Sequence, residues 1–227
     1  MIYDFLPVSL ADYPGKVAAT VFVSGCNFKC PYCHNSSLIK PQEPLKTQSE
    51  FMKYLRQRRA LIDGVCITGG EPTLWNGLRK FIIDIKEEGF DVKLDTNGSR
   101  PDVLETLMND KLLDYIAMDI KAPLAKYNVY AAKAEDIFNV KKSMNLIMAS
   151  ETDYEFRTTV NQNLLSVEDF SNIADLIANA KRYVLQPYKY SEGVLNKYVC
   201  GVKPCDPRYM EEIKSYLVCR MPNIMLR

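Results

Sequence analysis

The sequence predicts an α/β fold in which helices cover a parallel β-sheet. Short β-branched or apolar runs alternate about six times with amphipathic helical patterns. Each interval between two runs is long enough for a right-handed crossover, which parallel strands require. The 227 residues, 47% of them hydrophobic, can form one full core but are too few for two ordinary domains. We therefore predict one soluble globular domain of the α/β class.

The individual elements follow from local patterns in chain order. The predicted strands cover residues 17–24, 64–68, 91–96, 115–120, 154–160 and 183–186. The predicted helices cover residues 48–61, 78–88, 101–109 and 134–148, and a fifth begins at Ser166. Thr47 and Glu50 form a capping box before the first helix, and Gly89 ends the second.

The carboxy-terminal part has a different character. Residues 188–206 contain Gly193, Gly201 and Pro204 and are predicted to form an irregular connection before a final helix over 207–219. Strand and helix alternation alone is compatible with a doubly wound open sheet or with a partial barrel. We favour a partial (β/α)6, TIM-like barrel within a single domain of residues 1–227, with a core of about residues 15–190 and an irregular extension of about residues 188–227.

The charge balance and the lack of targeting signals argue against nucleic-acid and membrane partners. Lys and Arg total 29 against 28 Asp and Glu, so no overall field draws the chain to nucleic acid or to an anionic membrane. The amino terminus lacks the pattern of a secretion signal, and no apolar run reaches membrane-spanning length. We therefore expect a cytoplasmic protein with no nucleic-acid or membrane partner.

Three of the seven cysteines, Cys26, Cys30 and Cys33, lie within eight residues directly after the first predicted strand. An odd count with such crowding favours metal ligation in a reducing compartment over a disulfide framework. A closed zinc site or a simple electron-transfer cluster usually has four protein ligands, whereas three thiolates leave one iron of a cluster open to another ligand. These cysteines are therefore the leading catalytic and metal-ligating candidates. The alternative is a zinc site completed by His34, the only histidine.

The remaining cysteines are interpreted as structural. Cys66 lies in the middle of a predicted strand and is expected to be a buried thiol. Cys200, Cys205 and Cys219 could bind a second metal or form a redox pair, but no compact CxxC spacing joins them.

Polar residues and glycines follow the predicted strands at the edge where the carboxyl ends of parallel strands meet. Ligands bind at this edge in α/β sheets. Taken singly, each motif could be an ordinary turn or a charge pair at a strand end. Arg157 lies within a predicted strand, where a buried guanidinium needs an anionic partner. The candidate binding residues are Gly69, Gly70, Glu71, Asp95, Thr96, Asn97, Asp119, Lys121, Arg157 and Gln186.

The CxxxCxΦC spacing, with the aromatic Tyr32 before the last cysteine, resembles the signature of the radical S-adenosylmethionine (radical SAM) superfamily. The whole chain resembles the activating proteins of glycyl radical enzymes, above all those of anaerobic ribonucleoside-triphosphate reductase, with the pyruvate formate-lyase activating enzymes as relatives. The segments that support this resemblance are Leu-Ala-Asp-Tyr-Pro-Gly at residues 10–15, Gly25-Cys26, Cys33-His34-Asn35 and Leu226-Arg227.

The resemblance implies a radical SAM core with a 4Fe-4S cluster on Cys26, Cys30 and Cys33, S-adenosylmethionine as cofactor, and Tyr32 beside it. It implies that one electron cleaves S-adenosylmethionine to methionine and a 5'-deoxyadenosyl radical, which abstracts hydrogen from a glycine of a partner enzyme. The implied partners are a glycyl radical enzyme, anaerobic ribonucleotide reductase first, and an electron donor such as flavodoxin or ferredoxin.

The resemblance also implies roles for the strand-end residues. The segment of Gly69, Gly70 and Glu71 holds the methionyl amino group, and Asp95 lies near the nucleoside. Asp119 and Lys121 contact the cofactor, with Asp119 a ligand for a monovalent cation. An arginine at the position of Arg157 binds the methionine carboxylate, and Gln186 lies close to the adenosine.

Three alternatives remain open at this point. The chain could activate another glycyl radical enzyme, such as pyruvate formate-lyase. It could act on a small molecule, as a protein resembling the 7-carboxy-7-deazaguanine synthases. It could also be an electron-transfer or metal-scaffold protein with no bond-breaking role, in which case reduction with S-adenosylmethionine yields no 5'-deoxyadenosine.

Overall fold

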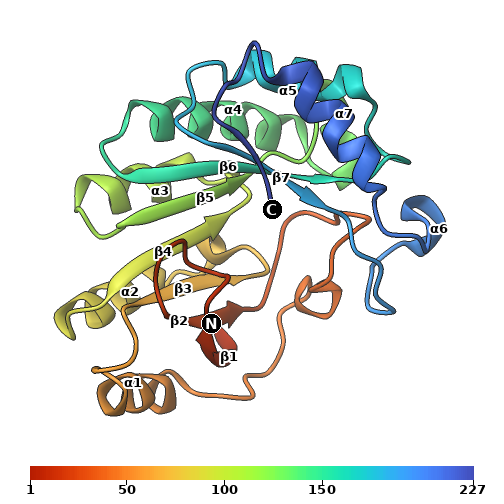
Figure 1. Cartoon of the computed structure of the whole chain (residues 1–227). Coiled ribbons are helices and arrows are strands. Elements are labelled where there is room, and N and C mark those ends of the chain that lie inside the picture. Colours follow the sequence, from red (N-terminus) through yellow and green to blue (C-terminus); the bar gives the residue numbers. More distant parts are fainter.

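A computed structural model describes residues 1–227 and shows one curved eight-stranded sheet whose strands lie side by side in chain order (Figure 1). Neighbouring strands from β2 to β8 are parallel, and β1 pairs with β2 in the antiparallel sense. The strands are β1 Ile2–Ser9, β2 Ala18–Val23, β3 Gly64–Gly69, β4 Asp91–Thr96, β5 Tyr115–Asp119, β6 Asp153–Val160, β7 Tyr183–Pro187 and β8 Ile224–Leu226. Because β1 and β8 do not pair with each other, the barrel is open on one side.

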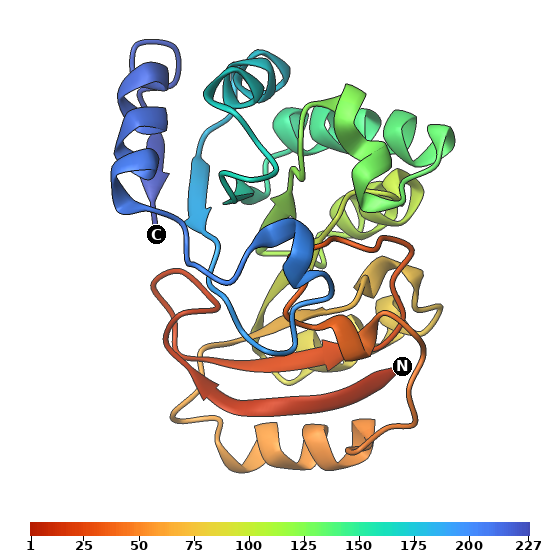
Figure 2. The same ribbon diagram turned by 90° about the vertical axis from the view of Figure 1, so that its right-hand side faces the viewer.

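Helices cover the outer face of the sheet (Figure 2). The α-helices are α1 Gln48–Gln57, α2 Leu78–Glu87, α3 Pro101–Asn109, α4 Ala134–Ala149, α5 Val167–Leu176, α6 Lys197–Cys200 and α7 Pro207–Leu217. Short 3-10 helices are η1 Ser36–Leu38, η2 Pro72–Leu74 and η3 Leu124–Tyr130. The capping box of Thr47 and Glu50 is present at α1, and Ser166 caps α5. No helix combines the length and the apolar character needed to cross a bilayer.

The predicted α/β partial barrel is confirmed, with two corrections to the strands. The six predicted strands correspond to β2–β7, but the sheet is not entirely parallel, because residues before Ser9 fold back as the antiparallel strand β1. The segment after α7 adds β8, a short strand parallel to β7. Both additions lie at sheet edges, where pairing with the neighbouring strand, rather than local sequence pattern, determines the conformation.

Two helices end at least two residues before the predicted position, and α2 ends one residue early, at Glu87. Helix α1 ends at Gln57 instead of residue 61, because Leu61 and Ile62 donate backbone hydrogen bonds to the Arg58 carbonyl and turn the chain toward β3. The final helix ends at Leu217 instead of residue 219, and the turn that follows leads to β8.

The segment before α7 lies across the carboxyl ends of the strands (Figure 2). It is mostly irregular, as predicted, but contains the short helix α6. Its backbone contacts the cysteine loop: Asn196 N donates to Pro31 O at 2.9 Å, and the Ser36 hydroxyl donates to Gly193 O at 2.5 Å. The segment before α7 therefore packs against the cysteine loop.

Candidate active site

One cavity of about 430 Å³ lies at the carboxyl ends of the strands and collects nearly all of the predicted site residues. Of the candidates, only Arg157 does not line it. The predicted residues that line the cavity are Cys26, Cys30, Tyr32, Cys33, Gly69, Gly70, Glu71, Asp95, Thr96, Asn97, Asp119, Lys121 and Gln186. The parallel topology explains this convergence, because it brings the ends of β3, β4, β5 and β7 to one edge.

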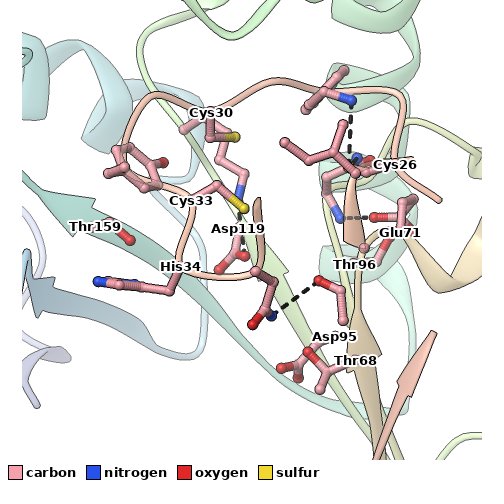
Figure 3. A pocket seen from close by; sticks show the side chains of 18 of the residues that line it. Cys26, Cys30, Cys33, His34, Thr68, Glu71, Asp95, Thr96, Asp119 and Thr159 are labelled. Carbon is pink, nitrogen blue, oxygen red and sulfur yellow. Dashed lines mark hydrogen bonds and ion pairs between the residues drawn. The ribbon is translucent and has the colours of Figure 1, made fainter. Parts of the chain in front are cut away.

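The three cysteines of the loop after β2 all face this cavity as free thiols. Figure 3 shows Cys30 and Cys33 on one side of the view and Cys26 on the other. Burial raises the pKa of the Cys26 thiol to about 12 and that of Cys30 to about 11. A metal ion would bind these cysteines as thiolates, so metal binding would deprotonate them despite their raised pKa values.

A single zinc ion finds no matching ligand set in this structure. No three His, Cys, Asp or Glu side chains converge on a point where they could hold one metal ion. The imidazole of His34 points away from the cysteine sulfurs in Figure 3, and its Nε2 lies 2.5 Å from the carbonyl of Lys189. Three separated thiols with no fourth ligand instead match a polynuclear cluster, whose iron atoms need not share one point.

Glu71 forms a buried junction between two strand ends. Its side chain is 1% exposed and accepts hydrogen bonds from Thr73 N at 3.1 Å, Thr96 Oγ1 at 2.8 Å and Asn97 N at 2.6 Å. Burial raises the pKa of this carboxyl, although these hydrogen bonds oppose the rise. Glu71 therefore joins η2 to the end of β4, and its oxygens already have partners within the protein.

A buried network of charged side chains lies at the ends of β4, β5 and β6. Arg157 donates through Nε to Asp119 at 2.9 Å and through its terminal nitrogens to Asp95 at 3.3 Å. Lys121 Nζ donates to the other oxygen of Asp119 at 3.0 Å, and Lys93 pairs with Asp95. Burial alone would raise the pKa of Asp119, but Arg157 and Lys121 outweigh it and hold that pKa well below its ordinary value. Arg157, predicted to bind a cofactor carboxylate, is thus already paired with two carboxylates of the protein.

Comparison with protein families matches residues 20–177 to the Radical SAM superfamily. The chain belongs to the radical SAM superfamily. Membership implies a 4Fe-4S cluster and S-adenosylmethionine as cofactors, and the three free thiols in one cavity with polar strand ends fit that pair.

Relatives support this assignment along most of the chain. A protein of Methanocaldococcus jannaschii, provisionally named a glycyl-radical enzyme activating enzyme, is 34% identical over 197 residues, which are 83% of this chain and 80% of the relative. The pyruvate formate-lyase-activating enzyme of Clostridium pasteurianum is 25% identical over 95% of this chain and 96% of its own length.

Among solved structures, the radical SAM fold is shared with SuiB of Streptococcus suis bound to its precursor peptide SuiA. The TM-score is 0.73 at 16% identity, and the match covers 92% of this chain and 48% of SuiB. The chain thus spans about half the length of SuiB, and the likeness concerns the fold alone.

Sequence reasoning missed several residues that the radical SAM cavity contains. Asp12 accepts a hydrogen bond from Thr20 Oγ1 at 2.6 Å, and Asn35 Nδ2 donates to Gly69 O at 3.2 Å. Asp12 and Asn35 lie within segments that supported the resemblance, so their motifs were the available signal. The missed lining residues are Asp12, Phe28, Asn35, Ile39, Thr68 and Thr159, and His34, considered only as a zinc ligand, also lines the cavity.

Proposed function

We propose that this radical SAM enzyme activates a glycyl radical enzyme, with anaerobic ribonucleoside-triphosphate reductase as the partner. The observation that carries the proposal is the gathering of three free thiols and the charged strand ends in one cavity. When bound there, the cluster and S-adenosylmethionine supply a one-electron cleavage that yields methionine and a 5'-deoxyadenosyl radical. The names of the relatives, both activating enzymes, favour a glycine of a partner protein as the hydrogen donor.

The residues of this chain have distinct proposed roles around the cofactors. Cys26, Cys30 and Cys33 hold the cluster. The Lys121 ammonium lies near these thiols. Burial alone would lower the pKa of Lys121, but the negative charges of Asp119 and Cys30 raise it by more, so that Lys121 stays charged. A fixed positive charge beside thiolates favours their ionised form.

Gly69 and Gly70 bring the end of β3 close to the backbone of β2 and of the loop that follows β2. Gly69 has φ +115°, and a Cβ there would lie 2.5 Å from the Val23 backbone, so only glycine fits. Both glycines line the cavity, and their segment is the proposed binding place of the methionyl amino group.

The open side of the barrel favours a macromolecular substrate. Because β1 and β8 do not pair, the sheet does not close, and the proposal is that a partner loop reaches the cavity from this side. A small-molecule radical SAM enzyme resembling the 7-carboxy-7-deazaguanine synthases would instead enclose its substrate and need no partner protein.

The experiment that tests this proposal uses cluster-reconstituted protein under anaerobic conditions. The protein is reduced with dithionite in the presence of S-adenosylmethionine, with and without anaerobic ribonucleoside-triphosphate reductase, and the partner is examined by electron paramagnetic resonance. A new glycyl radical signal only in the complete mixture is expected. Cleavage without that signal rejects this partner, and a signal with pyruvate formate-lyase instead would reassign it. Turnover of a small molecule without any partner would reject the activase function.

A further inference from the structure

A second depression adjoins the cysteine loop outside the cofactor cavity. It is a groove of about 510 Å³ whose walls come mostly from the segments 24–27, 39–42 and 74–77. The wall includes Trp75, the only tryptophan of the chain, so we call this depression the Trp75 groove. Cys26 lines both the Trp75 groove and the cofactor cavity. The two depressions therefore meet at one of the proposed cluster ligands.

Of the three proposed cluster ligands, Cys26 alone faces this groove. Cys26 is half-buried and lines both depressions, whereas Cys30 and Cys33 line the cavity but not the groove. Figure 3 shows Cys26 apart from the other two cysteines, on the other side of the view. A backbone hydrogen bond from Cys26 N to Ile39 O, at 2.9 Å, ties this ligand to the groove wall. A cluster held by the three thiols would therefore lie beside the groove at its Cys26 corner.

Trp75 gives the groove an aromatic wall that is fixed by its neighbours. The Trp75 ring packs against Phe81 with centroids 5.3 Å apart, and Trp75 N donates to Pro72 O at 3.0 Å. A further hydrogen bond, from Gln42 N to Ser24 Oγ at 3.1 Å, fixes another part of the wall to the cysteine loop. Tryptophan is enriched at protein interfaces, where its large ring buries much area. A preformed groove with such a wall suits the docking of another protein.

Cleavage of S-adenosylmethionine needs one electron from outside the chain, and the donor of that electron needs a face of its own. The cavity of about 430 Å³ would hold the cofactor, and the glycine of the partner enzyme has to reach that same cavity. A protein that delivers the electron while the cofactor is bound therefore docks elsewhere. The Trp75 groove offers such a face, because it adjoins a cluster ligand from outside the cavity.

The charges around the groove suit an acidic carrier. No charged side chain lines the Trp75 groove. The exposed Lys40 and Glu43 each lie next in sequence to a lining residue, and the lining residue Met1 carries the amino-terminal ammonium. Two positive groups against one negative group attract a protein with an acidic rim, an effect that speeds association and weakens with salt.

We infer that the Trp75 groove is the docking site of a small electron-carrier protein, which reduces the cluster at its Cys26 corner. The carrier presents a flavin or an iron-sulfur centre at an acidic surface. In this step the reduced centre of the carrier loses one electron and the cluster gains it, and no covalent bond forms or breaks. The inference rests on the one-electron cleavage of the proposed function and on no choice of glycyl radical enzyme.

The first test compares a protein reductant with a small one. Cluster-loaded protein is mixed anaerobically with flavodoxin hydroquinone or with dithionite, and the loss of visible cluster absorbance gives the rate of reduction without any cofactor cleavage. The test variant is Gln42→Glu/Asn76→Glu, which adds two negative charges at exposed lining positions. We expect the second-order rate constant with flavodoxin to fall at least about tenfold at low salt, and the rate with dithionite to stay within about twofold.

Gln57→Glu/Asn109→Glu is the matched control. It makes the same two exchanges at exposed positions, the last residues of α1 and α3, outside the groove. Both of its rates should match those of the unmodified protein. Equal flavodoxin rates in the two double variants, or an equal fall with dithionite in the test variant, would overturn the inference. So would the lack of a saturable reaction of the unmodified protein with both flavodoxin and a reduced ferredoxin.

Binding gives a readout that involves no electron transfer. Isothermal titration calorimetry measures the affinity of oxidised flavodoxin for cluster-loaded protein with and without S-adenosylmethionine. We expect dissociation constants within about twofold of each other in these two cases, and one at least about tenfold weaker for Gln42→Glu/Asn76→Glu. Flavodoxin binding that weakens when the cofactor is present would place the carrier at the cavity and refute the inference. A missing glycyl radical on the partner enzyme leaves these measurements unaffected, so failure of the proposed function is distinguishable from failure of this inference.

Discussion

Substituting Gly70 by alanine should damage the cluster site through a backbone clash. A Cβ at Gly70 would lie 2.2 Å from the carbonyl oxygen of Gly25 and 2.8 Å from its carbon. Gly25 directly precedes the cluster ligand Cys26. Two backbone hydrogen bonds hold these segments together, from Gly70 N to Val23 O at 2.7 Å and from Glu71 N to Gly25 O at 2.8 Å.

The size of the effect follows from this geometry. An ordinary nonbonded contact needs roughly 3.5 Å, so the two backbones must separate by about 1 Å or more. Overpacking of this kind costs about 1–3 kcal/mol in well-packed proteins, and here the strain acts on backbone that no rotamer change can relieve. We therefore expect Gly70→Ala to lower the free energy of unfolding by about 2 kcal/mol and to displace Cys26.

Chemical denaturation of the cluster-free protein measures the stability change, and iron content with visible absorbance after reconstitution measures cluster loading. Gly193→Ala is the matched control, because a Cβ there meets only the His34 carbonyl oxygen at 3.7 Å, an ordinary contact. Equal stability and equal iron content in the Gly70→Ala and Gly193→Ala proteins would refute the proposed close approach of Gly70 to Gly25.

Three further predictions concern other parts of the chain. Cys30→Ala should abolish cluster loading, measured as iron and sulfide content, whereas Cys200→Ala should leave it nearly intact; equal losses would mean that the ligands are misassigned. Glu71→Gln should lower the free energy of unfolding by about 1–3 kcal/mol in denaturant titrations, because an amide cannot accept all the hydrogen bonds that the buried carboxylate accepts, and an unchanged midpoint would contradict this. Burial raises the pKa of Asp169, but Lys126 and the cap of α5 lower it below its ordinary value of 3.8, so its stabilising contribution exists above that pH and is lost as the pH falls. Asp169→Asn should therefore cost about 1 kcal/mol at neutral pH and progressively less in acid, as followed by thermal unfolding across pH; a constant difference would be inconsistent with this cause.

Much of the fold could be predicted because its central elements have strong local signals. The apolar runs of β2–β7 and the caps of α1 and α5 are readable within a few residues. Strand β1 was missed because it is an edge strand that contains Pro7 and depends on pairing with β2. Strand β8 has three residues, and its position depends on β7 and on the ion pair of Arg227 with Glu155, which no local pattern reveals.

The sequence predicted which residues line the candidate site better than it predicted which of them contact one another. The cysteine spacing and the polar strand ends identified most of the residues that line the cavity. The sequence did not reveal that Glu71 turns its oxygens toward Thr96 and Asn97, or that Arg157 pairs with Asp95 and Asp119. These contacts depend on the register between neighbouring strands. Lys93 falls within a predicted strand, but the strand pattern does not predict its burial. In the folded sheet Lys93 is buried and forms an ion pair with Asp95.

The most direct test of the account is cleavage of S-adenosylmethionine by the purified chain. The protein is reconstituted anaerobically with iron and sulfide, reduced with dithionite, and supplied with S-adenosylmethionine, and 5'-deoxyadenosine is quantified beside the Cys30→Ala variant. The account predicts 5'-deoxyadenosine and methionine from the unmodified protein and none from the variant. An intact, reducible cluster that yields no 5'-deoxyadenosine would contradict it.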